Sequence, residues 1–134
     1  MALLHERLDL PITGRRFDFF NPDPTLALEP GSGMLTFGAL EQIGPQHDRW
    51  LEFVLAQRPL ICVDVAGIEE LYDEHDLADY LGLAYHRRRG YLAGYLTALR
   101  RLETAGRIEI LAAHRHRFGN QFDDPYSYVA WRPR

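Results

Sequence analysis

Arginine side chains dominate the chemistry that the second half of this chain could perform. Residues 84–117 contain eight arginines against only two glutamates, so ion pairing within that stretch cannot neutralise them. A guanidinium group can bind a phosphate, or the edge of a guanine base, through two parallel hydrogen bonds. Such a density of arginine is typical of a surface that binds nucleic acid.

Charge is distributed unevenly along the chain. The sequence has 134 residues and a formal net charge of −4. Residues 1–83 hold 5 Arg against 15 acidic residues, and residues 84–134 hold 10 Arg against 4, which gives formal charges of −10 and +6. The imbalance indicates a basic working face on an acidic body.

Apolar spacing predicts the elements that precede the basic region. A helix is expected over residues 46–57, because Trp50, Leu51, Val54 and Leu55 recur at helical spacing, and a buried strand is expected over 60–65. A second helix is expected over about 69–81, either continuous or divided near Asp73. Four residues are predicted to share its buried face: Leu71, Leu77, Tyr80 and Leu81. Gly82 would end it.

A third helix is expected to carry the arginines and to end at Gly106. At about 100° per residue, Leu92, Leu96 and Leu99 form its buried stripe, with Arg88 toward the same side. The opposite side would present Arg87, Gly90, Tyr91, Gly94, Thr97, Ala98 and Arg101. Each glycine costs about 1 kcal/mol in a helix interior. Either the helix begins near Gly90, or another element packs closely against these glycines.

Two strands, at 108–111 and 126–131, are expected to follow and to be joined by a long polar loop. The order of these elements resembles the winged helix-turn-helix superfamily over residues 47–131. The resemblance is carried by DLADYLGL at 76–83 and LRRLETAGRIEI at 99–110. It implies an α+β fold with three helices and a β-hairpin wing, in which the third helix enters the DNA major groove. Residues 84–90 lengthen the usual connection by about two helical turns.

Residues 1–44 are expected to form an extended arm or a small hairpin, with strands at 25–29 and 34–37, and residues 45–134 the winged-helix domain. The arm is rich in phenylalanine, as at Phe17, Phe19, Phe20 and Phe37. A second copy of the chain is one expected partner of this arm.

Other clusters predict little chemistry. His114 and His116 alternate along the chain, but two histidines without an acidic or Cys partner make a weak metal site. The acidic run from Asp73 to Asp79 is interpreted as helix caps and a solvated face, and Cys62 as a buried apolar residue. No nucleophile motif or phosphate loop occurs, so neither an enzyme nor a cofactor is predicted. No window resembles a membrane span, and a cytoplasmic location is expected.

The sequence therefore predicts a winged-helix transcriptional regulator that binds duplex DNA through its third helix and basic wing. The residues expected to contact DNA are Arg87, Arg88, Arg89, Tyr91, Thr97, Arg100, Arg101, Arg107, His114, Arg115 and Arg117. The alternative is a protein-interaction module on the same scaffold, an adaptor or inhibitor of a nucleic-acid-processing complex. One continuous positive face would favour DNA, whereas arginines divided among acidic neighbours would favour the adaptor.

Overall fold

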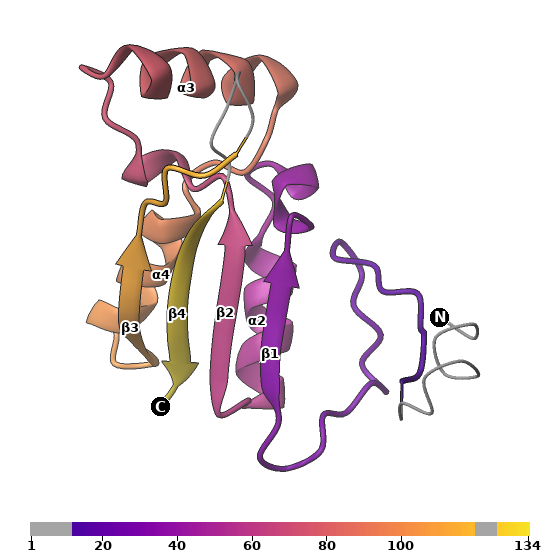
Figure 1. Ribbon diagram of the computed structural model, residues 1–134. Helices are drawn as coiled ribbons and strands as arrows, with labels where there is room; N and C mark the ends of the chain where they lie inside the picture. The colour runs from indigo at the N-terminus through magenta and orange to yellow at the C-terminus, as the bar shows by residue number, and fades with distance from the viewer. Residues whose placement is uncertain (1–11, 120–125) are drawn as a thin grey trace.

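A four-stranded sheet with two helices behind one face and a third helix across its end forms the body of the protein (Figure 1). The computed structural model describes residues 12–119 and 126–134. Its strands are β1 (Gly33–Phe37), β2 (Ile61–Ala66), β3 (Ile108–His114) and β4 (Ser127–Pro133). Its helices are α2 (Asp48–Gln57), α3 (Leu77–Arg89) and α4 (Tyr95–Thr104), with 3-10 turns η1 (Leu40–Ile43) and η2 (Glu69–Leu71). The expected α+β class is confirmed.

The strands lie in the order β1-β2-β4-β3, with β1 parallel to β2 and the other pairs antiparallel. Side chains alternate across the sheet, so one face of β2 is buried through Cys62, Asp64 and Ala66. That face packs against α2 and α4, and the apolar core lies between them. Cys62 is fully buried, as predicted, and burial raises the pKa of its thiol to about 12.

A buried carboxylate joins four elements at the centre of this core. Asp64 on β2 accepts hydrogen bonds from the Thr36 hydroxyl on β1, the Tyr95 hydroxyl on α4 and the Trp131 indole on β4, each at 2.7 Å. The Trp50 indole on α2 donates in turn to the Tyr95 hydroxyl at 3.4 Å. Desolvation raises the pKa of Asp64 despite these three donors.

The described part of the N-terminal region packs onto its own chain. The rings of Phe17 and Phe19 contact Trp50 on α2, with centroids 5.8 and 5.2 Å away. The Gln57 side chain binds the backbone of Leu26 and Leu28 at 2.8 Å. The expected hairpin is not formed, because residues 34–37 pair in parallel with β2 and residues 25–29 are not a strand.

The predicted boundaries of the second and third helices are wrong. The second helix is divided, as the alternative allowed, into η2 and α3, and Asp76 caps α3 by accepting a hydrogen bond from the Asp79 amide. Gly82 does not end α3, which continues to Arg89 and stops at Gly90, where φ is +65°. The third helix is α4, which begins only after Gly94, where φ is +70°.

This boundary changes which residues share a helix face. Arg87, Arg88 and Arg89 form the last turn of α3, and Tyr91 lies in the connection between the two helices. These four residues were predicted to lie on the same helix as Thr97 and Arg101, but only Thr97 and Arg101 belong to α4.

The other predicted elements are confirmed with small shifts. The helix at 46–57 is α2, the strand at 60–65 is β2, and the final two strands are β3 and β4. The pairing of β3 with β4 is interrupted between Ile110 and Ala112, which leaves Leu111 exposed. The loop expected over 114–125 lies partly outside the described residues. Within residues 12–119 and 126–134, no helix combines the length and apolar character needed to cross a membrane.

Replacement of Asp64 tests the buried junction. Because the folded-state pKa of Asp64 lies above 3.8, the folded protein retains this proton longer than the unfolded chain. Protonated Asp64 therefore contributes stability that is fully present below the pKa of this group in the unfolded chain. That contribution is lost as pH rises through the higher pKa of the group in the folded protein. We expect the stability of wild type relative to Asp64→Asn to fall over that range in urea unfolding experiments.

A difference between the two proteins that is constant or grows with pH would contradict this assignment. The control is Asp64→Ala, which leaves three buried donors without an acceptor. It is expected to lower the free energy of unfolding by about 3 kcal/mol or more.

Candidate functional site

The residues predicted to contact DNA are divided among three regions of the fold. The C-terminal end of α3 and the connection after it hold Arg87, Arg88, Arg89 and Tyr91. The exposed side of α4 and the turn after it hold Thr97, Arg100, Arg101 and Arg107. The end of β3 and the segment after it hold His114, Arg115 and Arg117. The DNA hypothesis requires these regions to form one continuous positive face. Whether they do depends on the groups that each region contacts.

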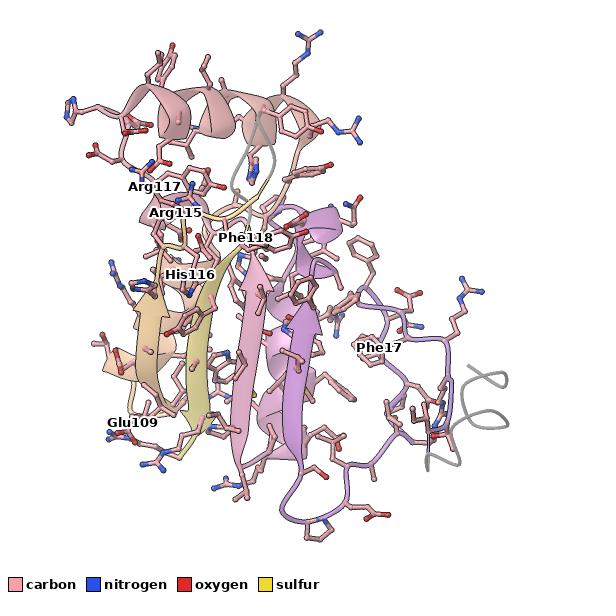
Figure 2. All side chains as sticks on the ribbon, in the orientation of Figure 1. Phe17, Glu109, Arg115, His116, Arg117 and Phe118 are labelled. Atoms are coloured by element: carbon pink, nitrogen blue, oxygen red, sulfur yellow. The ribbon has the colours of Figure 1, made fainter. Side chains whose placement is uncertain are left out.

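The basic segment after β3 is bound to α3 through a buried carboxylate. Arg115 donates to Asp79 at 2.8 Å, and Arg117 approaches Asp76 at 3.3 Å and Asp79 at 3.6 Å (Figure 2). The Asp79 and Arg115 side chains are only 2% and 13% exposed. The Arg115 guanidinium also lies over the Tyr72 ring, 4.0 Å from its centroid. These arginines hold α3 against the end of the sheet.

The ionised form of Asp79 is stabilised by its surroundings. Desolvation acts to raise its pKa, but the hydrogen bond from the Asp73 amide, the Arg115 hydrogen bond and the charges of Arg115 and Arg117 outweigh it, and the pKa is lowered. The acidic run from Asp73 to Asp79 thus supplies a cap and ion pairs.

Acidic side chains also occupy the places where α3 and α4 would meet a phosphate. Arg87 is paired with Glu74 at 2.8 Å and lies 3.9 Å from Glu69. At the N-terminus of α4, the Gly94 amide donates to Glu69 at 3.1 Å and the Thr97 amide donates to Glu70 at 2.9 Å. A helix N-terminus is a natural anion site, and here two carboxylates of η2 fill it.

A smaller basic set remains on the surface. Arg88, Arg100, Arg101 and Arg107 are exposed, and none has an ion pair within the part of the chain that the structure describes. Arg89 lies over the Tyr91 ring, 5.5 Å from its centroid. Arg100 and Arg101 belong to α4, whereas Arg88 belongs to α3.

His114 and His116, the two histidines considered as metal ligands, lie in an aromatic cluster on the open face of the sheet. The His114 and His116 rings are 4.7 Å apart, and both contact Tyr128 on β4. No acidic side chain joins them, and residues 12–119 and 126–134 contain no group of three His, Cys, Asp or Glu suited to a metal ion.

The open face of the sheet was not identified from the sequence as a candidate functional surface. We define the sheet-face hollow as the depression of about 440 Å³ lined by Val63, Val65, His116, Phe118, Tyr126 and Tyr128. Phe37 stacks on Tyr126 at its edge, and the Phe118 ring also contacts Tyr126, with centroids 5.7 Å apart. Phe37 and Phe118 are 63% and 69% exposed. The alternation of Leu35 and Phe37 with buried Thr36 signals a second apolar face on β1.

The second missed surface lies on α3, where the predicted buried face is in fact exposed. Leu77 and Leu81 are 72% and 54% exposed, and Tyr80 is exposed with them. The residues of α3 that are buried are Asp79, Gly82, Leu83 and His86. The sequence shows that Leu77, Tyr80 and Leu81 share one side of a helix, but the side of α3 that contacts the body was assigned incorrectly.

Comparison with protein-family models, with curated proteins and with solved structures found no match to this chain.

Removal of one arginine tests whether the basic segment holds α3 in place. Arg115→Ala leaves the buried Asp79 carboxylate without its closest cation, and we expect it to lower the free energy of unfolding by about 3 kcal/mol. Arg100→Ala, at an exposed position on α4, is the matched control and should change it by less than about 0.5 kcal/mol. Chemical denaturation measures both, and equal losses would contradict the structural role of Arg115.

Proposed function

We propose that this protein is a protein-interaction module on a winged-helix type of scaffold, and that its open sheet face receives an apolar segment of a partner protein. The order helix, strand, two helices and β-hairpin supports the scaffold, together with the position of β4 between β2 and β3. The interaction role was the alternative that the sequence left open.

The observation that carries this proposal is the division of the arginines among acidic neighbours. Of the residues expected to contact DNA, Arg87, Arg115 and Arg117 form ion pairs with side chains from the segment 69–79. Glu69 and Glu70 add negative charge at the N-terminus of α4, the end of a recognition helix that reads bases. Phosphates approaching this end would meet carboxylates.

The chemistry of the sheet-face hollow favours an apolar protein segment. Its lining is made of aliphatic and aromatic side chains, with tyrosine hydroxyls and one histidine as polar groups. Exposed tyrosines and phenylalanines supply large contact areas at protein interfaces. A single-stranded nucleic acid would also stack on such rings, but it requires cations along its backbone. Arg115 and Arg117 are instead paired with Asp79 and Asp76 at α3, and Arg115 also donates to the backbone carbonyl of His116 at 2.6 Å (Figure 2).

Capture of the partner with matched surface variants tests this proposal. The tagged protein would be crosslinked in lysate of its source, with Phe37→Asp/Phe118→Asp as the test variant and Phe20→Asp as the control. Phe20 is also exposed, at 51%, but lies in the N-terminal segment away from the sheet face. We expect one protein to be recovered with wild type and control and to fall at least about tenfold with the test variant, as for loss of a central interface residue.

Equal recovery with all three proteins, or no recovery with any of them, would overturn the interaction proposal. Circular dichroism of each variant establishes that the fold is retained.

Duplex DNA remains a second candidate ligand, because Thr97, Arg100 and Arg101 are exposed together on α4. Under the interaction proposal, fluorescence anisotropy with duplex DNA should give only the weak, non-specific class of affinity, about 10⁻⁴–10⁻⁶ M at physiological salt. Binding near 10⁻⁸ M or tighter, abolished by Arg100→Glu/Arg101→Glu, would establish the DNA function in its place.

A further inference from the structure

We propose that α3 is a self-association helix, and that two copies of the chain pair through antiparallel α3 helices about a twofold axis. This inference goes beyond the proposed function and does not depend on it, because it uses a different surface from the sheet-face hollow. It also replaces the N-terminal arm, whose Phe17 and Phe19 pack on their own chain, as the expected dimer contact.

The outward side of α3 is a stripe of apolar and aromatic side chains that ends at Arg88. At about 100° per residue, six side chains fall within an arc of about 140°. They are Leu77, Tyr80, Leu81, Ala84, Tyr85 and Arg88, and all six are exposed. The buried residues Asp79, Gly82, Leu83 and His86 lie on the opposite side. The spacing i, i+3, i+4, i+7, i+8 is that of a helix surface that packs against another helix.

The position of α3 leaves this stripe open to a second helix. Figure 1 shows α3 crossing the end of the sheet at the outside of the fold, and no other helix of residues 12–119 and 126–134 lies over its outer side. Contiguous apolar side chains that a fold leaves exposed mark a surface for protein contact. The described chain covers only the side that contains Leu83 and His86.

Charge along α3 identifies the occupant as a second copy. The segment that leads into the helix is acidic, with Asp73, Glu74 and Asp76, and its last turn is basic, with Arg87, Arg88 and Arg89. Glu74 and Asp76 are paired with arginines of their own chain. Asp73 at one end and Arg88 and Arg89 at the other have no ion pair within the described residues.

An antiparallel arrangement satisfies these charges and a parallel one does not. Two antiparallel copies bring the acidic end of each α3 beside the basic end of the other, whereas parallel copies bring like charges together. A twofold axis near Leu81 places Leu77 of one copy opposite Tyr85 of the other and Leu81 opposite Leu81. The same patch then serves both subunits, as an isologous interface requires.

Sedimentation velocity from micromolar to near-millimolar concentration tests the proposal. Wild type should sediment as a dimer in the upper part of this range. Leu81→Glu places two carboxylates at the axis and should weaken dimerisation at least about a hundredfold, and Arg88→Glu about tenfold. Arg101→Glu, an equal charge change on α4, and Phe37→Asp/Phe118→Asp on the sheet face should sediment as wild type does.

A cysteine at the axis tests the antiparallel register. The native Cys62 is fully buried, so Leu81→Cys introduces an exposed thiol that should form an intermolecular disulfide within the dimer under mild oxidation. A cysteine at position 77 should crosslink to itself far more slowly, because Leu77 lies away from the axis.

Three results would overturn the proposal: wild type that remains monomeric at every concentration, a dimer insensitive to Leu81→Glu, or faster crosslinking of Leu77→Cys than of Leu81→Cys. A monomer that binds a different protein through α3 counts as the first of these. Circular dichroism of Leu81→Glu shows whether the monomer is folded, and Arg88→Glu supplies an independent result if it is not.

Discussion

The burial of Asp64 is the constraint on which the arrangement of the sheet and α4 depends. A carboxyl group in an apolar core is strongly unfavourable unless donors replace the water that it loses. Those donors come from Thr36 on β1, Tyr95 on α4 and Trp131 on β4, elements widely separated along the chain. The junction is satisfied only when all three elements reach β2 together, so it specifies the register of β1 and the position of α4 at once. No residue of α3 takes part.

A second buried carboxylate, that of Asp79, attaches α3 to the rest of the fold, and its partners are basic residues. Asp79 and Asp76 bind Arg115 and Arg117, and Glu74 binds Arg87. Side chains that resemble a nucleic-acid surface in the sequence therefore stabilise the contact between α3 and the end of the sheet. What remains exposed on α3 and on the open sheet face is largely apolar. Large exposed apolar surfaces on a folded chain mark sites of protein contact.

Much of the fold was predictable because its periodicities are local. The pattern around Trp50 and the run ending at Val65 predicted α2 and β2 within two residues. Two kinds of information were not local. The periodicity of α3 shows that Leu77 and Leu81 share one side, but it cannot show which side meets the body. The pairing of Arg115 with Asp79 joins residues 36 positions apart, so a count of charges within 84–117 could not reveal it. Gly82 was predicted to end the second helix and Gly90 was one possible start of the third, whereas α3 ends at Gly90 and α4 begins after Gly94.

Arg115 and Arg117 hold α3 against the end of the sheet. A double-mutant cycle between Arg115 and Asp79 measures how strongly the two side chains are coupled, with the free energy of unfolding determined for wild type, Arg115→Ala, Asp79→Ala and the double variant. If Arg115 holds α3 through Asp79, the coupling energy should be about 2 kcal/mol, as for residues in one buried network. Effects that add to within about 0.5 kcal/mol would show that the two side chains act independently. That result would contradict the structural role of Arg115 and return it to the residues available for a nucleic acid.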